Sequence, residues 1–202
     1  MTQASTSKSA PSEGTRAMIL ATGRGLVARH GFSAMGLSAL LREAGVPKGS
    51  FYHYFASKEA FGEALLTDYV TDYLARMDAM IARETTGANR LLAFCDTWLA
   101  KGQAEGLAHT CLVVKLGAEV ADLSETMRCV LDDGVAALTQ RLETILEQGA
   151  NDGSLIRSVH PAQTAQVLYA QWLGAAILSK LAKDQAPLIR ALADTKTRLL
   201  PQ

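Results

Sequence analysis

Residues 31–61 have the sequence GFSAMGLSALLREAGVPKGSFYHYFASKEAF, and this segment decides the fold of the chain. Leu37, Leu40 and Leu41 have the i, i+3, i+4 spacing of one buried helical face. Gly45 follows at a position where a helix end favours a residue with positive φ. The pattern predicts two short helices joined by a tight turn, followed by the start of a longer helix.

The second short helix is expected over residues 48–55, directly after Pro47, whose missing N–H costs nothing at a helix start. Phe51 and Phe55 make one side of it aromatic. The other side carries the small or donor-rich side chains that a reader of the DNA major groove needs, Lys48, Gly49, Ser50, Tyr52 and His53. An ordinary corner between two helices is the alternative, but the combined turn, glycine and lysine spacing favours DNA recognition.

The ends of the neighbouring helices add further candidates for contact with DNA. Gly36 or Ser38 can cap the first short helix, and Ser57 can cap the long helix that follows. Lys58 then lies at a helix N-terminus, where its ammonium and the free backbone N–H groups face an anion. We therefore expect Gly36, Ser38 and Lys58 to contact DNA together with the second helix.

The string GVPKGSFYHYFASKEAF at residues 45–61 resembles the helix-turn-helix of the TetR family of one-component bacterial transcriptional regulators. The resemblance covers the DNA-binding head, residues 14–61, and the rest of the chain fits in length and helical content. It implies an all-α chain with a three-helix N-terminal head and a helical body that binds ligand and dimerises. At Met35 and Gly36 the family commonly has threonines that contact a phosphate and cap the helix, and only the capping position is kept here.

Composition and charge agree with a helical DNA reader. The chain has 202 residues, of which 49% are hydrophobic and only five are proline, which favours an all-helical fold. Its net charge is zero, which alone argues against a nucleic-acid binder. However, residues 14–60 hold six basic and two acidic residues, a net charge of +4, and residues 61–202 hold 13 basic and 17 acidic residues, a net charge of −4. A basic head on an acidic body indicates an attached DNA-binding unit.

We expect three parts along the chain: a disordered tail at 1–13, the DNA-binding domain at 14–60, and the ligand-binding and dimerisation domain at 61–202. The tail is small and polar, and nothing in it has the pattern of a signal peptide. The most apolar stretch, 167–182, contains Gln171 and Lys180 and falls short of a membrane span.

The three cysteines and the motifs of the chain exclude several classes of site. No CxxC pair is present, which fits a reduced cytoplasm better than a disulfide framework. His109 and Cys111 are too few ligands for zinc, and no cofactor motif is found, so neither a metal nor a cofactor is expected. We expect a cytoplasmic protein with no membrane partner.

Apolar periodicity predicts a first helix over 14–31 and later helices over 58–84, 88–105, 125–148, 161–183 and 185–199. The helix at 58–84 starts in the head and ends in the body, so it can act as a lever. In the segment 107–128, Leu112, Val113 and Val114 could form a buried strand, but the spacing also fits a helix, which we prefer because no partner strand is evident. Residues 149–153, GANDG, predict a turn.

The helix at 161–183 is apolar nearly all round and must be buried on more than one side. In a chain of this size, that suggests that one face meets a second subunit. The resemblance implies a homodimer whose interface is a four-helix bundle built from residues 161–200. Two recognition helices would then lie about one DNA turn apart, ~34 Å, and would bind a palindromic operator.

The family resemblance also implies a small-molecule inducer bound in the body. Candidate lining residues, from helical spacing and chemistry, are Tyr69, Tyr73, Met77, Phe94, Trp98, Cys111, Lys115, Tyr169 and Trp172. Taken singly, an aromatic or methionine residue at helical spacing is more often core than pocket.

Cys111 is the candidate to which the sequence gives the most specific chemical role. In a helix, Lys115 would lie one turn on, and its ammonium would lower the pKa of the thiol and make the sulfur a target for electrophiles or oxidants. The alternative is an inert cysteine packed as a small hydrophobe.

The string CLVVKLGAEVADLS at residues 111–124 resembles the same region of N-ethylmaleimide-responsive and acrylate-responsive repressors, a branch of the family that senses electrophiles. The resemblance places Cys111 at the sensing position and implies acrylate or a related electrophile as inducer. Lys180, in an apolar helix, needs an acceptor and can approach this sulfur.

Three alternatives remain beside an electrophile-sensing repressor. The first is a repressor with a reversible ligand and an inert Cys111. The second is a thiol enzyme that uses Cys111 with His109 or Lys115, but it lacks a positioned third group and a glycine-rich oxyanion site, so no enzyme is expected. The third is a helical interaction module that binds no DNA.

Overall fold

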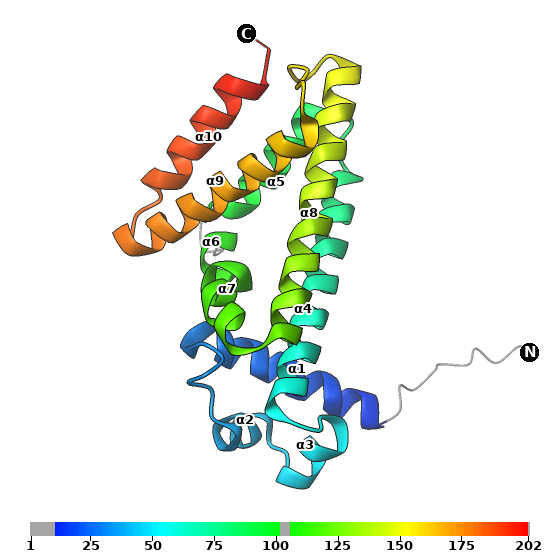
Figure 1. The fold of residues 1–202 in the computed structure, drawn as a ribbon, viewed down its shortest axis with the longest axis vertical. Helices are drawn as coiled ribbons and strands as arrows, with labels where there is room; N and C mark the ends of the chain where they lie inside the picture. Colours follow the sequence, from blue (N-terminus) through cyan, green and yellow to red (C-terminus); the bar gives the residue numbers. More distant parts are fainter. Residues whose placement is uncertain (1–10, 102–105, 202) are drawn as a thin grey trace, which may run out of the picture.

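A computed structural model describes residues 11–101 and 106–201 of the chain, with side chains from residue 14 onward (Figure 1). The helices are α1 (Pro11–His30), α2 (Leu37–Ala44), α3 (Lys48–Tyr54), α4 (Lys58–Ile81), α5 (Gly87–Trp98), α6 (Leu107–Thr110), α7 (Leu112–Leu123), α8 (Glu125–Asp152), α9 (Pro161–Ala182) and α10 (Ala186–Leu199). The expected all-α fold is confirmed, since the described residues form helices and no strand longer than one residue. None of the described helices is long and apolar enough to cross a membrane.

The helices divide between the two ends of an elongated molecule. Helices α1, α2 and α3 form a head at one end, and the long helices α4 and α8 pack side by side along the long axis (Figure 1). Helices α9 and α10 lie at the opposite end and pack on each other, and α9 also packs on α8. Helix α7 lies between the head and the far end, directly above α1 and α2 in Figure 1.

The local signals of the head are confirmed. Gly36 occupies the cap position of α2, whereas Ser38 lies inside that helix. Gly45 ends α2 with a φ of +65°, which a side chain would strain. The hydroxyl of Ser57 caps α4 by accepting the backbone N–H of Ala60 at 3.0 Å.

Four predicted helix ends differ from the structure by three residues or more, and one of them is the end of α4, at Ile81 instead of 84. Helix α1 begins at Pro11 instead of 14. Residues 1–10 lie outside the described part of the chain, and the disordered tail remains a prediction. Helix α5 ends at Trp98 instead of 105. Helix α8 continues to Asp152, and only Gly153, with a φ of +76°, breaks it. The glycine at 149 is therefore a place of close approach between helices rather than a turn residue.

The segment 107–128 is helical as predicted, but it is broken at Cys111. This residue has a φ of −67° and a ψ of 120°, which ends α6 and makes it the cap of α7. One free N–H at the start of α7 is satisfied from outside the segment, because Leu112 donates to the Tyr69 hydroxyl at 3.2 Å.

Two clusters of buried side chains stabilise the molecule. One lies in the body, between α5, α8, α9 and α10. The other begins in the head, around Phe51 and Phe61, and continues without a break into α7 and α8 through Leu116, Val120 and Met127. The head therefore shares its core with the body, and the division at residue 60 remains a prediction.

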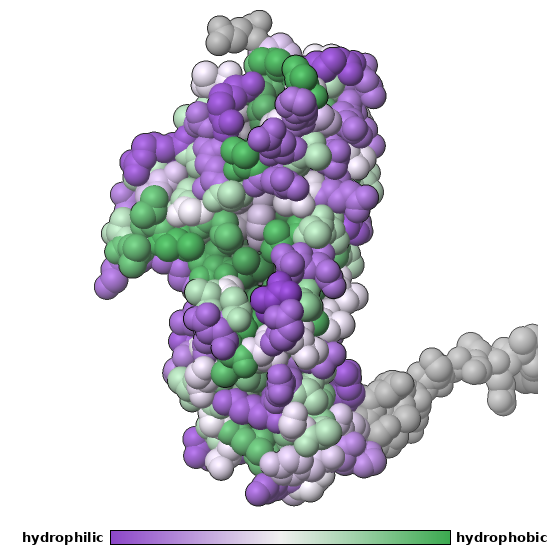
Figure 2. Space-filling view, viewed as in Figure 1, coloured by the Kyte–Doolittle hydropathy of each residue, from purple (hydrophilic) through white to green (hydrophobic). Residues whose placement is uncertain are grey.

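Large apolar side chains remain exposed on α9 and at the start of α10. Figure 2 shows hydrophobic side chains gathered where the end of α9 meets α10. The exposed large apolar side chains near this junction are Ile177, Leu178, Leu181 and Ile189, and Val167 is a further one near the start of α9. Leu181 is 77% exposed, so a strongly apolar surface faces outward here.

The crossing of α5 and α8 gives a test of the fold. A Cβ on Gly87 would lie 2.2 Å from the Cα of Gly149, and backbone cannot give way as a side chain can. We expect Gly87→Ala to destabilise the protein by about 1–3 kcal/mol, measured by urea or thermal unfolding. Gly117→Ala is the control, because its Cβ would lie 3.9 Å from Val113 and the exchange should stabilise α7 by about 0.5–1 kcal/mol. Equal stability of the two variants would contradict this account of the crossing.

Candidate DNA interface and ligand chamber

Helix α3 presents one polar, exposed face. Lys48, Gly49, Tyr52 and His53 are exposed, and Ser50 is half-buried. The Lys48 ammonium lies 5.8 Å from the centroid of the Tyr52 ring, which aligns a cation with an exposed aromatic side chain. These five predicted residues therefore form one solvent-facing surface.

The opposite face of α3 is held by aromatic packing. Phe51 is fully buried and Phe55 is 3% exposed. The Phe51 ring centroid lies 5.5 Å from that of Phe61 and 5.3 Å from that of Phe55. Burial of these rings fixes the helix and turns its polar side outward.

The other predicted DNA contacts divide into two groups. Gly36 and Ser38 are exposed at the start of α2, where free backbone N–H groups face outward. Lys58 is different: its ammonium donates to the carbonyl of Ser33 at 3.2 Å and lies 5.1 Å from the ring centroid of Phe32. Lys58 therefore contacts the connection between α1 and α2, and its contact with DNA stays a prediction.

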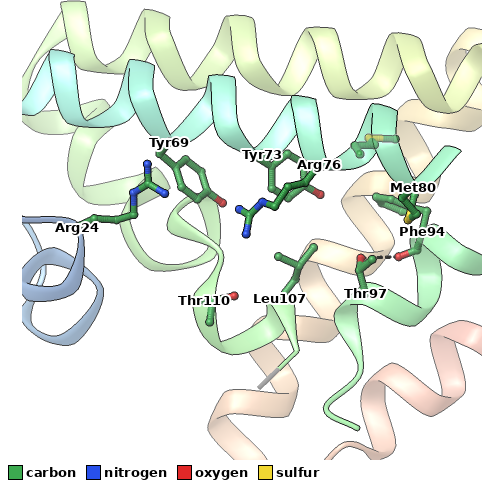
Figure 3. Close-up of a pocket in the computed structure, with 10 residues that line it drawn as sticks. Arg24, Tyr69, Tyr73, Arg76, Met80, Phe94, Thr97, Leu107 and Thr110 are labelled. Carbon is green, nitrogen blue, oxygen red and sulfur yellow. Dashed lines mark hydrogen bonds between the residues drawn. The ribbon is translucent and has the colours of Figure 1, made fainter. Parts of the chain in front are cut away.

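A chamber of about 470 Å³ opens between α4, α5 and α6 (Figure 3). Its volume falls in the range of small-molecule sites. It is lined by Arg24, Tyr69, Tyr73, Arg76, Met77, Met80, Phe94, Thr97, Leu107 and Thr110. The predicted residues Tyr69, Tyr73, Met77 and Phe94 are thus brought together, most of them on one face of α4.

Hydrogen-bond donors and a charged cluster supply the polar part of the chamber. Burial raises the pKa of both Tyr69 and Tyr73, so their phenols remain neutral donors. Arg24, from α1, pairs with the carboxylates of Asp68 and Asp72 on α4. Arg76 lies 3.3 Å from the same Asp72, so the two arginines at the chamber are already balanced by carboxylates.

Cys111 lies behind the chamber rather than in it. Its side chain is 3% exposed and lines a separate cavity of about 20 Å³, shared with Tyr69, Tyr73 and Tyr169. A space of this size holds about one water molecule, not an inducer.

Burial raises the pKa of the Cys111 thiol above its ordinary value. The N–H groups at the start of α7, the Tyr69 hydroxyl and the charge of Lys180 act in the opposite direction and do not overcome burial. The thiol is therefore mainly protonated at neutral pH, and these groups would stabilise the thiolate once it forms.

The predicted partnership of Cys111 with Lys115 is wrong. The Lys115 ammonium donates to the carbonyl of Arg29, at 3.4 Å, and so points to the head. The physical reason is the break at Cys111, which makes this residue the cap of α7. The backbone N–H of Lys115 donates to the Cys111 carbonyl oxygen at 3.2 Å, and this bond does not involve the sulfur. Lys180, on α9, supplies the positive charge that acts on the thiol.

Two predicted lining residues belong to the core of the body. Trp98 and Trp172 are fully buried, with ring centroids 6.3 Å apart. The indole of Trp172 donates to the Thr195 hydroxyl at 3.2 Å, which fixes α9 against α10. Tyr169 lies between this core and the small cavity at Cys111. Its ring centroid is 6.2 Å from that of Trp98, and its side chain lines the cavity.

Six residues of the chamber wall were not among those predicted from the sequence: Arg24, Arg76, Met80, Thr97, Leu107 and Thr110. Helical spacing could have found two of them, because Arg76 and Met80 lie three and seven residues after Tyr73 on α4. No local signal marks Arg24, which reaches the chamber only because α1 packs against α4.

Comparisons with known proteins agree with the geometry. Residues 19–65 match the model described as bacterial regulatory proteins, tetR family, and residues 87–194 match the tetracyclin repressor-like C-terminal domain. The chain is 45% identical over 183 residues to the HTH-type transcriptional repressor NemR of Escherichia coli K12, covering 90% of this chain and 92% of that protein. It is 30% identical over 159 residues to the transcriptional regulator AcuR of Cereibacter sphaeroides, covering 78% and 73%.

A solved structure shows the same arrangement of helices. The crystal structure of the reduced form of E. coli NemR superimposes with a TM-score of 0.85 and 44% sequence identity, over 93% of this chain and 98% of that one. The family consists of transcriptional regulators and not enzymes, which removes the thiol-enzyme alternative. The chain therefore belongs to the TetR family of bacterial transcriptional regulators.

Proposed function

We propose that this protein is a cytoplasmic, homodimeric repressor that holds a palindromic operator when unliganded and leaves it when a small molecule acts on the body. The observation that carries the proposal is the solvent-facing polar surface of α3, fixed by a buried aromatic core, in one molecule with the 470 Å³ chamber. TetR-family regulators bind operator DNA as dimers and respond to small molecules, and the relative with 45% identity is named a repressor.

The dimer is proposed to form through residues 161–200. The exposed apolar side chains of α9 and α10 support this, since Leu178, Leu181 and Ile189 are each more than half exposed in the single chain. Pairing these two helices with their copies gives a four-helix interface and a two-fold axis. The two α3 helices would then enter successive major grooves of the operator.

We propose that the inducer is acrylate or a related electrophile that reacts at Cys111. The thiolate sulfur attacks the terminal carbon of an activated double bond; a carbon–sulfur bond forms, and the displaced π electrons take up a proton at the neighbouring carbon. The start of α7 and the nearby Lys180 charge support the thiolate, while the phenols of Tyr69 and Tyr73 can donate to a carbonyl or carboxylate. Entry requires the tyrosine rings between chamber and thiol to move.

A reversible inducer held in the chamber, with Cys111 inert, is the second candidate. It is favoured by the burial of the thiol, 3% exposed, and by its raised pKa. In either case the inducer shifts the operator equilibrium only by its preference for one conformation of the protein over the other.

The DNA face is tested with Lys48→Ala. Each protomer of the dimer loses one cation from the interface, so we expect roughly tenfold weaker binding and a salt slope lower by about 2. The measurement is a fluorescence titration of DNA from upstream of the protein's own gene, at several salt concentrations. Arg83→Ala is the control, because Arg83 is exposed in the turn that follows α4, far from α3, and the variant should bind as the parent does. A Lys48→Ala protein with parental affinity and slope would remove α3 from the interface.

Covalent and reversible induction are separated by Cys111→Ser. N-ethylmaleimide should release the parent and Cys129→Ser from DNA but leave Cys111→Ser bound, with the affinity of the unmodified variants within about twofold of each other. Cys129 is the matched control because it is the more exposed cysteine of the two. If Cys111→Ser is still released by acrylate, the reversible scheme holds.

Substitutions of Lys180 and Lys115 should have different effects on the reactivity of the Cys111 thiol. Because burial raises the pKa of Cys111, the thiolate fraction should rise about tenfold per pH unit below that pKa, and the labelling rate with it. Lys180→Met removes the charge that lowers the pKa and should slow labelling several-fold between pH 7 and 8. Lys115→Met should label within about twofold of the parent, since its ammonium contacts Arg29. Mass spectrometry of the Cys111 peptide measures both rates, and the reverse order would restore Lys115 as the partner of the thiol.

A further inference from the structure

Helix α7 is joined to the head by a carboxylate on the connection between α1 and α2. Glu119 accepts two backbone N–H groups, from Phe32 at 3.1 Å and from Ser33 at 2.6 Å. Burial alone would raise the pKa of Glu119, but the bonds from Ser33 and Phe32 and the charge of Lys115 lower it below its ordinary value. The carboxylate is therefore ionised and makes charge-assisted bonds to the backbone of the head.

Gly31 makes room for this contact. It has a φ of +87°, and a Cβ at this position would lie 3.0 Å from Oε2 of Glu119. The glycine thus serves two purposes: it turns the chain after α1, and it lets the carboxylate approach the backbone.

Two neighbours of Glu119 bind the head as well. Lys115, one turn earlier, donates to the carbonyl of Arg29 in the last turn of α1. Ser124, directly after α7, donates to the carboxylate of Glu59 in the first turn of α4. The end of α1, the α1–α2 connection and the start of α4 are all contacted from residues 115–124.

The other end of α7 lies at the chamber. Its cap is Cys111, and its first N–H is bonded to Tyr69, which lines the chamber. A helix of 12 residues spans about 18 Å. It is rigid over this length, so a displacement of the cap moves Glu119 with it.

We propose that α7 is the strut that transmits the state of Cys111 to the DNA-binding head, and that Glu119 is the positioning residue at its far end. The proposal rests on the proposed function for the roles of Cys111 and α3. An added group on the sulfur cannot fit in the present cavity of about 20 Å³, so its walls must move. Because Cys111 is itself the cap of α7, the start of α7 shifts together with the tyrosine rings. The shift breaks the bonds from Glu119 to Phe32 and Ser33, and α2 and α3 lose their fixed angle to the body.

This route differs from a lever through α4. Helix α4 belongs to head and body alike, so a tilt of α4 would carry the head without any need for Glu119. If α7 is the strut, by contrast, the signal passes through the two hydrogen bonds that Glu119 accepts from Phe32 and Ser33, and a substitution of Glu119 removes them.

The test uses the full-length Cys129→Ser protein as parent and N-ethylmaleimide as the probe, with labelling of Cys111 verified by mass in every sample. Hydrogen exchange of the amides of Phe32 and Ser33 is followed by mass spectrometry, without DNA. We expect labelling to speed their exchange at least tenfold in the parent and in Asp122→Asn, an exposed carboxylate on the same helix. In Glu119→Gln, exchange should be fast before labelling and unchanged by it.

A second arm measures operator affinity before and after labelling. The loss of affinity seen in the parent should persist in Asp122→Asn and fall below about threefold in Glu119→Gln. If labelling leaves Phe32 and Ser33 protected in the parent, or if Glu119→Gln responds as the parent does, the strut is overturned. If exchange changes as expected but the labelled parent still holds its operator, the strut stands and the proposed induction by electrophiles fails.

Discussion

The structure depends on three aromatic rings beneath a helix that could not exist alone. Helix α3 has seven residues, well below the length at which an isolated helix is stable in water. Phe51, Phe55 and Phe61 lie with ring centroids 5.1 to 5.5 Å apart and supply the missing stability through burial. Because all of the packing is on one side, the polar side chains on the other are left to the solvent. A DNA-binding helix packed in this way is rigid before it contacts DNA, so no conformational entropy is lost in ordering it on binding.

The head of this protein was predictable from its sequence because its signals are local. Gly45, Pro47 and Ser57 each have a conformational or capping preference that a few neighbouring residues reveal, and the structure uses them as predicted. The chamber was only partly predictable. Tyr73 and Met77 share a face of α4 by spacing alone, whereas Arg24 reaches the same space from another helix, which no local pattern records.

The thiol site shows where periodicity fails. A continuous helix through 107–128 would place Lys115 beside Cys111, and the sequence offers nothing against it. The break at Cys111 is made by tertiary contacts, with Tyr69 taking the N–H of Leu112, and it sends Lys115 to the head and leaves the charge at the thiol to Lys180. One residue in an extended conformation thus separates two side chains that helical spacing would place together: the thiol of Cys111 in the body and the ammonium of Lys115 at the head.

The charged side chains beside the chamber also help to fix the position of the head. Arg24 belongs to α1, and its carboxylate partners Asp68 and Asp72 belong to α4, so these ion pairs link head and body beside the chamber. A carboxylate ligand that approaches Arg76 meets a guanidinium already paired with Asp72 and must compete for it. Half-exposed pairs of this kind are individually weak and can be exchanged at little cost. Because the Arg76–Asp72 pair lies within α4, a carboxylate on Arg76 would leave Asp72 to Arg24, and the α1–α4 ion pairs and the shared core that runs from Phe51 to Met127 would still hold the head.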